Sequence, residues 1–152
     1  MADDRPWHLL GATEISDQLQ SGAVTPTQLA EYFLRRAERD TLGAYVRVTP
    51  DTAMRQAAAL ELVPPARRGP LWGLPHADKD LLLRRGTPTL FGSAAAVALW
   101  NDERNPLMGA DNDPLVDVVD RLGLVSLGKT NTPEFGMTGF TESAVAAPAR
   151  HP

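Results

Sequence analysis

The chain has 152 residues, of which 43% are hydrophobic and 22% are charged, so it can bury the core of one folded domain and is not a disordered chain. Its net charge of −4, with arginines scattered along the sequence, offers no basic surface, and we expect no direct nucleic-acid partner. The absence of cysteine excludes disulfides, a thiol nucleophile and cysteine metal sites. Three widely separated histidines form no cluster of metal ligands, so we expect no metal and no cofactor.

The start of the sequence and its apolar runs argue against export or membrane insertion. Residues Met1–Asp4 are acidic, whereas a signal peptide begins with positive charge. The longest apolar run, Ala94–Trp100, is too short to cross a bilayer. These features predict a soluble, cytoplasmic protein without a membrane partner.

The first part of the sequence predicts helices. Residues Thr25–Gln28 form a capping-box pattern with proline at the first helical position, and apolar residues then recur on one face, which predicts a helix over 26–39. The same kind of signals predict a helix over 13–20 ended by Gly22, a strand over 44–48 and a helix from Pro50 to Leu60.

Residues 63–70 contain three prolines and two arginines, which predicts an exposed connection. We expect the helical part before it, residues 1–62, and the part after it, residues 71–152, to form one domain rather than two.

The second part of the sequence predicts an α/β layer. Glycines divide residues 74–93 into short segments that favour strands and tight turns. The pair Asp113-Pro114 begins a predicted helix through Leu122, and residues 124–127 then predict a short buried strand. The apolar residues of that helix share one face: Leu115, Val118, Val119 and Leu122. A helix that leads into a buried strand favours the α/β fold class with at least partly parallel strands.

Only two of the fifteen basic residues are lysines, Lys79 and Lys129. An arginine stays charged in a protein, whereas a buried lysine can lose its proton and act as a base. Lysine is therefore informative here, and each of the two lies in a distinctive segment.

Residues Gly123–Thr130 match the spacing of a phosphate-binding loop, G-x-x-x-x-G-K-[ST]. Such a loop needs a strand before its first glycine and a helix that opens at its lysine, but here a helix comes first and strand-forming residues fill the loop. We therefore reject a nucleotide site. Lys129, Thr130 and Asn131 instead follow a buried strand, at the edge of the sheet where α/β folds place their sites. The alternative is a solvated lysine at a strand end.

Lys79 is flanked by two carboxylates, Asp78 and Asp80. If residues 74–81 form a strand, both aspartates lie on one face and Lys79 lies on the other. An apolar environment on that other face would desolvate Lys79 and favour its neutral form. The alternative is that Lys79 simply pairs with one of the aspartates.

Several motifs occur in a characteristic order: Gly73-Leu74-Pro75, Lys79-Asp80, Gly92-Ser93, the segment Leu127–Phe135, and Thr141-Glu142. With this order the chain resembles the amidase signature family, from its N-terminal helices to its last residue. The resemblance implies a mixed, twisted sheet flanked by helices, of which this chain carries the N-terminal part. It also implies hydrolysis of a carboxylic acid amide through a Ser-cisSer-Lys triad.

The resemblance assigns roles to particular residues. Lys79 matches the family's catalytic lysine, which as a neutral amine takes a proton from a bridging serine that in turn activates the nucleophilic serine. The segment Gly128, Lys129, Thr130 and Asn131 matches a motif near the catalytic centre, so we expect these residues to support the substrate site.

The sequence departs from the family pattern in two ways. The residue before the matching lysine is commonly apolar in the family, whereas here it is Asp78, which indicates a subgroup or a changed charge environment. The family's glycine- and serine-rich segment, which carries both catalytic serines, is expected shortly after a stretch such as residues 147–152. No serine present lies in such a segment (Ser16, Ser21, Ser93, Ser126 and Ser143). Ser93 after Gly92 comes closest, and we assign it a structural role in a turn.

We therefore interpret the chain as the N-terminal part of an amidase that carries the base without the nucleophile, and we expect no hydrolysis by the chain alone. The alternatives are a glutaminase-type subunit of a tRNA-dependent amidotransferase and a catalytically inactive interaction module. The expected substrate is a small-molecule amide. Because an incomplete sheet leaves unpaired edges, we expect association with a complementary C-terminal amidase chain or with a second copy.

Overall fold

The structure is a computed structural model that describes residues 6–100 and 111–152. Its helices and strands are, in chain order, α1 (Ala12–Ser21), α2 (Pro26–Ala37), β1 (Tyr45–Val48), α3 (Pro50–Glu61), β2 (Pro75–Lys79), α4 (Ala94–Trp100), α5 (Pro114–Arg121) and β3 (Val125–Thr130). Three short 3-10 helices cover Trp7–Leu9, Pro65–Arg67 and Glu134–Gly136.

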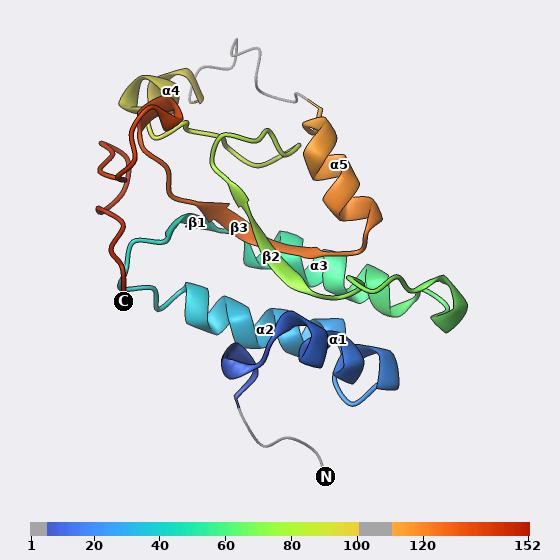
Figure 1. The fold of residues 1–152 in the computed structure, drawn as a ribbon. Coiled ribbons are helices and arrows are strands. Elements are labelled where there is room, and N and C mark those ends of the chain that lie inside the picture. Colours follow the sequence, from blue (N-terminus) through green and yellow to red (C-terminus); the bar gives the residue numbers. More distant parts are fainter. Residues whose placement is uncertain (1–5, 101–110) are drawn as a thin grey trace.

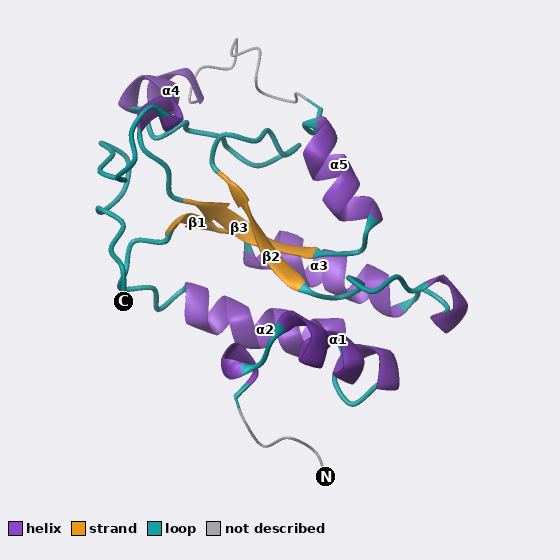
Figure 2. Ribbon diagram, in the orientation of Figure 1, coloured by secondary structure: helices purple, strands orange, loops and turns teal. Residues whose placement is uncertain are grey.

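The strands form one mixed sheet in the order β1-β3-β2 (Figure 2). Strand β1 is antiparallel to β3, and β2 is parallel to β3. The long connection between β2 and β3 contains α4 and α5, as a parallel pair requires a crossover. This architecture confirms the predicted α/β class with a mixed sheet flanked by helices.

The start of α2 shows why the local sequence dictates its structure. The side-chain oxygen of Thr25 accepts a hydrogen bond from the Gln28 amide at 3.2 Å, and the Gln28 side chain accepts one from the Thr25 amide at 2.9 Å. This reciprocal capping box satisfies N–H groups that the first helical turn leaves free. At the end of α1, Gly22 takes the left-handed conformation (φ 76°) that favours glycine.

The helices α2 and α3 pack against one face of the sheet (Figure 1). Their small side chains Ala30, Ala53 and Ala57 meet Val125 and Leu127 of β3 in one apolar cluster. A second cluster joins α1 to the segment before β2 and includes Leu19 and Trp72. Helix α5 lies to the upper right of the sheet in Figure 1, where it buries Val116 and its Asp120 accepts from Gln56 of α3 at 3.5 Å. The face of the sheet that α2 and α3 cover is therefore apolar. Lys79 and Lys129 lie near one end of the sheet.

Three elements differ from the sequence-based expectation. Strand β2 ends at Lys79, earlier than predicted, because the amides of Leu81 and Leu82 turn back to the Lys79 carbonyl. Strand β3 continues to Thr130, later than predicted, so Gly128 and Lys129 are strand residues. Helix α4 was not predicted, although its alanine-rich sequence suits a helix.

The long β3 also agrees with the rejection of a phosphate-binding loop, because no helix opens at Lys129. Within residues 6–100 and 111–152, none of the helices combines the length and the apolar character that crossing a membrane requires.

Candidate active site

The parallel strands β2 and β3 bring the two lysine segments together. Lys79 lies opposite Thr130 in the strand register, and Asp78 lies opposite Lys129. Asn131 follows directly, and its amide donates to the Ala44 carbonyl at 2.8 Å. Because parallel strands end at the same edge of a sheet, Lys79 and the segment 128–131 share that edge. This arrangement makes the edge the candidate site.

Lys79 is exposed, which corrects the expectation of a desolvated lysine on an apolar face. The predicted alternation holds, since Asp78 and Asp80 lie together and are buried, but the buried face is the one that holds the carboxylates. Lys79 is the last residue of an edge strand, and the described residues do not cover its side chain. Within the described part of the chain, Lys79 also pairs with neither aspartate.

Lys129 is the buried lysine, with an exposed fraction of 0%. Its ammonium donates to the Leu82 carbonyl and, at 2.8 Å, to the Thr89 hydroxyl. It lies 3.5 Å from a carboxylate oxygen of Asp80, whose side chain is 1% exposed. Burial lowers the pKa of Lys129 and raises the pKa of Asp80, because each charge has lost its water, while the attraction between the two charges opposes both shifts.

Asp78 belongs to a second buried network, centred on Arg84. The guanidinium of Arg84 contacts Asp78 through two nitrogens, at 2.5 and 3.2 Å, and contacts Asp120 of α5 at 3.0 Å. The Ser126 hydroxyl donates to Asp78 at 2.8 Å. Burial tends to raise the pKa of Asp78, but the hydrogen bonds and positive charge of Arg84, together with Ser126, outweigh it and lower the pKa. The negative charge of Asp78, the residue that departs from the family pattern, is therefore balanced by Arg84 inside the fold.

Gly128 lets β1 approach β3 closely. A Cβ atom added there would lie 2.1 Å from the Arg47 carbonyl oxygen, and its φ of 151° is one that side chains rarely adopt. Thr130, the next residue of the motif after Lys129, is half-buried, and its hydroxyl lies 3.4 Å from the Asp78 carbonyl oxygen. Both contacts hold strands together.

Asn131 ties distant segments to the end of β3. Its side-chain amide donates to the carbonyls of Gly43 at 3.1 Å and Ala147 at 2.9 Å. Its side-chain oxygen accepts from the Thr132 amide at 2.9 Å. The contacts that motif residues 128–131 make in this structure are contacts within the fold, and their support of a substrate site stays a prediction.

Two turns beside this edge have unusual backbone conformations. Phe91 and Phe135 have positive φ values of 52° and 50°. The Phe135 amide donates to the Phe91 carbonyl at 2.7 Å, and the two rings stack with their centroids 6.4 Å apart. Non-glycine residues in this region store strain, which is commoner near functional sites than elsewhere. Ser93 lies buried in the adjacent turn, where its carbonyl accepts from the amides of Ala96 and Val97 in α4.

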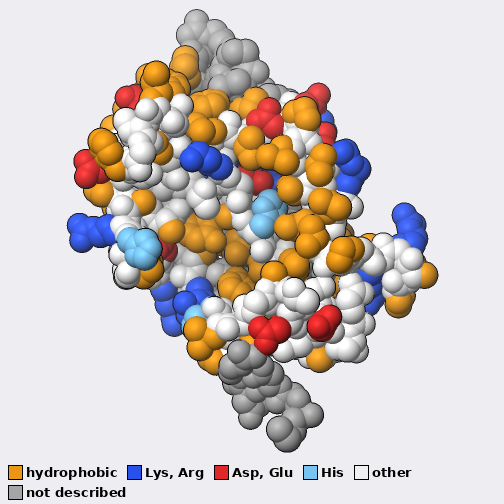
Figure 3. All heavy atoms as spheres, in the orientation of Figure 1, with side chains coloured by type: hydrophobic (Ala, Val, Ile, Leu, Met, Phe, Trp, Pro, Cys, Tyr) orange, Lys and Arg blue, Asp and Glu red, His pale blue; other side chains and the backbone are white. Residues whose placement is uncertain are grey.

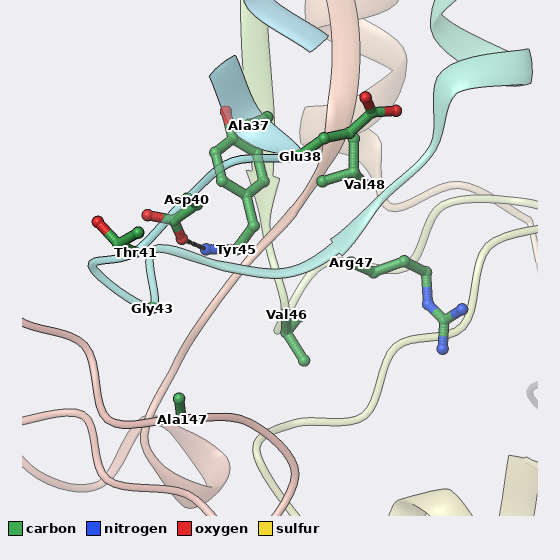
Figure 4. A pocket seen from close by; sticks show the side chains of 10 residues that line it. All are labelled: Ala37, Glu38, Asp40, Thr41, Gly43, Tyr45, Val46, Arg47, Val48 and Ala147. Carbon is green, nitrogen blue, oxygen red and sulfur yellow. Dashed lines mark hydrogen bonds between the residues drawn. The ribbon is translucent and has the colours of Figure 1, made fainter. Parts of the chain in front are cut away.

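A pocket lies between the end of α2, strand β1 and Ala147, on the β1 side of β3 (Figure 4). Its lining includes Asp40, whose carboxylate accepts from the amide of Tyr45 at 3.1 Å, and Arg47, which points away from Asp40. Because Lys79 does not line this pocket, it is not the candidate site. Among the described residues, no group of three or more His, Cys, Asp or Glu side chains could hold a metal ion.

Arg84, Thr89 and Asp120 were not predicted as partners in the site, and Asp80 was not predicted as the partner of Lys129. The Arg84–Asp120 and Lys129–Thr89 contacts join residues 36 and 40 positions apart in the sequence. The only local signal was the pair of aspartates around Lys79, whose alternation correctly placed them on one face.

The mixed sheet flanked by helices is the architecture that the resemblance implied, and its strand register places Lys79 beside Thr130. The family model of the amidases matches residues 28–152, and the chain belongs to this family, the amidase signature family.

Individual relatives agree with that assignment. The chain is 32% identical to an acylamidase of Rhodococcus erythropolis over 149 residues, which are 95% of this chain and 30% of that protein. It is 30% identical to one of the subunits of the glutamyl-tRNA(Gln) amidotransferase of Paraburkholderia xenovorans, over 95% of this chain and 28% of that protein. Among solved structures, the peptide amidase of Stenotrophomonas maltophilia superimposes with a TM-score of 0.69 and 26% identity over 91% of this chain and 28% of that one. The chain thus spans less than a third of the length of these relatives.

Proposed function

We propose that this chain supplies the lysine base of an amide-hydrolysing site, with Lys79 as the base of a Ser-cisSer-Lys triad. The observation that most directly supports this proposal is the strand register, which places Lys79 beside Thr130 at the carboxyl ends of β2 and β3. Membership of the amidase family supports the reaction class, hydrolysis of a carboxylic acid amide to the acid and ammonia or an amine.

In the proposed reaction Lys79 acts as a proton carrier. A neutral lysine amine takes a proton from a bridging serine, which takes one from the nucleophilic serine as that serine attacks the amide carbonyl. Loss of water around the amine favours the neutral form. Since Lys79 is exposed here, we propose that further protein corresponding to the remainder of the relatives' fold covers it and brings the two serines.

The first test uses a hybrid in which this chain replaces the matching segment of the Rhodococcus erythropolis acylamidase. The hybrid should hydrolyse amides, and Lys79→Ala should lower kcat by about 10³-fold or more, because a triad without its base keeps little of its rate. Arg55→Ala, which removes an exposed cation on α3, is the matched control and should leave kcat unchanged. Equal activity of the Lys79→Ala hybrid and its parent would refute the role of Lys79.

The chain alone should release no ammonia from amides, because we assign none of its serines to the nucleophile. Turnover by the isolated chain that disappears in Lys79→Ala would contradict this expectation and place a nucleophile within these 152 residues.

A second candidate function is favoured by the similarity to the glutamyl-tRNA(Gln) amidotransferase. In that case the chain would contribute to a glutaminase that works within a multi-subunit, cytoplasmic enzyme. Stable co-elution of the chain with the other components of such an amidotransferase in size-exclusion chromatography would support this function. A correctly folded hybrid without any hydrolysis would instead favour the third interpretation, an inactive interaction module.

A further inference from the structure

Lys129 joins three points of the segment that follows Lys79. Its ammonium donates to the Leu82 carbonyl and to the Thr89 hydroxyl, and it lies beside the Asp80 carboxylate. Asp80 in turn accepts from the Leu90 amide at 3.1 Å through its other oxygen. The pair formed by Asp80 and Lys129 therefore fixes both ends of the segment 80–90 against β3.

The same contacts define the backbone turn that begins at Lys79. The Lys79 carbonyl accepts from the amides of Leu81 at 2.7 Å and Leu82 at 2.9 Å. Asp80 is the second residue of this turn, and its amide donates to the Thr130 carbonyl at 3.1 Å. Lys129 contacts this turn at two points: its ammonium pairs with the Asp80 carboxylate and donates a hydrogen bond to the Leu82 carbonyl.

The burial of this pair distinguishes it from an ordinary ion pair at the surface. Two opposite charges with exposed fractions of 0% and 1% are costly to bury unless they also make hydrogen bonds. Asp80 receives one hydrogen bond and Lys129 donates two, all to groups of the segment 82–90. These contacts tie the turn that follows Lys79, at Asp80 and Leu82, to Thr89 and Leu90 later in the segment.

We propose that Asp80 and Lys129 form a positioning pair, which fixes the turn 79–82 and thereby sets the direction in which Lys79 leaves the sheet. This inference rests on the proposed function and adds Asp80 to the residues on which the reaction depends. The pair acts through the backbone of Lys79 and does not touch the reacting atoms.

The first experiment uses the full chain and the double variant Asp80→Asn, Lys129→Met, which removes both charges and keeps the side-chain sizes similar. Amide hydrogen exchange at Asp80, Leu82 and Leu90, followed by NMR, should become about tenfold faster, because the turn opens more often without its clamp. Exchange at Leu34 in the core of α2 should stay the same. Unchanged exchange in the turn would overturn the proposal.

The second experiment places the same double variant in the acylamidase hybrid and separates kcat from KM. A misdirected base slows the chemical step without weakening substrate binding, so kcat should fall by about 10²-fold while KM stays within about twofold. The control is Val116→Ala, a cavity variant at the buried residue of α5 that also lowers stability, assayed well below both melting temperatures. The control should keep its kcat.

The outcomes separate the two proposals. If the hybrid is active and needs Lys79 but is indifferent to Asp80→Asn, Lys129→Met, the positioning pair is refuted and the proposed function stands. If Val116→Ala loses as much kcat as the double variant, the pair is merely structural, which also refutes the inference. If the parent hybrid does not depend on Lys79, the proposed function fails and the positioning role fails with it.

Discussion

Asp78 shows how one substitution relative to a family pattern can be accommodated. Its carboxylate lies on the face of β2 opposite Lys79 and is surrounded by the donors of Arg84 and Ser126. Arg84 also binds Asp120, so the network connects β2 to α5. A carboxylate at this position therefore leaves the exposed face around Lys79 free of its side chain. Asp78 therefore changes the charges on the buried face of β2, beside Arg84, and not on the face that carries Lys79.

The network makes a prediction about pH. The pKa of Asp78 is lower in the folded chain than its ordinary value, so on acidification the unfolded chain takes up the proton first. The stability that this carboxylate contributes is complete above about pH 5 and is lost as the pH falls through the folded pKa. Asp78→Asn should be less stable at neutral pH by about 2–4 kcal/mol, since it breaks a buried pair. It should also lose less stability on acidification than the wild type.

Urea denaturation at neutral pH and near pH 3 measures both effects. Asp17→Asn, which changes an exposed aspartate of α1, is the matched control and should follow the wild-type pH dependence. Asp80 has a raised pKa, which acts with the opposite sign, but it is present in all three proteins and cancels in the comparison. Parallel pH profiles for Asp78→Asn and wild type would show that Asp78 is not the residue responsible.

Elements whose signals are local could be predicted from the sequence, whereas their partners could not. The capping box of α2 and Gly22 after α1 involve neighbouring residues, and both helices were correctly predicted. For α5, the periodicity of the apolar residues indicated the wrong buried face. Its periodic residues Leu115 and Leu122 are 55% and 44% exposed, while Val116 is the buried one. Periodicity identifies an apolar face but not whether another element covers it.

The length of β3 depended on a contact that no local pattern contains. Its extension through Gly128 requires β1 to pair with it, with the Arg47 carbonyl close to the glycine. In the candidate site, family resemblance located Lys79 and residues 128–131, and alternation located the aspartates. That Lys79 is exposed and Lys129 is buried could not be predicted from the sequence. The burial of Lys129 depends on Thr89 and Leu82, which the chain brings back over β3.

Gly128→Ala tests the pairing of β1 with β3. The added methyl group cannot fit 2.1 Å from the Arg47 carbonyl oxygen, so β1 must move away. We expect a loss of at least about 2 kcal/mol in the free energy of unfolding, from overpacking and from an unfavourable φ. Gly69→Ala, where an added Cβ meets no atom within 4 Å, should change it by less than about 0.5 kcal/mol. Equal stability of Gly128→Ala and wild type would contradict the close approach.

The molecule as a whole has one well-covered side and one open side. Helices α2 and α3 cover the apolar face of the sheet, but β2 is an edge strand, and hydrophobic side chains gather over the region of α5 on the face shown in Figure 3. Further apolar side chains are exposed after β3, at Phe135, Met137 and Phe140. Relatives of more than three times this length share the fold of this segment. The open side is therefore where we expect the remainder of the amidase fold, or another copy of the chain, to pack.

The outer face of α5 predicts self-association of the chain when nothing else covers it. Leu115, Val118 and Leu122 are 55%, 40% and 44% exposed and follow helical spacing, so they form a continuous apolar stripe. Replacing all three by glutamine should leave the melting temperature nearly unchanged, because these side chains are partly solvated already. It should weaken self-association at least about tenfold, since burial of the stripe no longer favours the dimer. Sedimentation velocity over a range of concentrations measures this change.

Leu62→Gln removes a single apolar side chain that is 84% exposed beyond α3, and it should associate like the wild type. A triple variant that associates as strongly as wild type would exclude the α5 stripe and leave the edge of β2 as the surface through which copies of this chain meet.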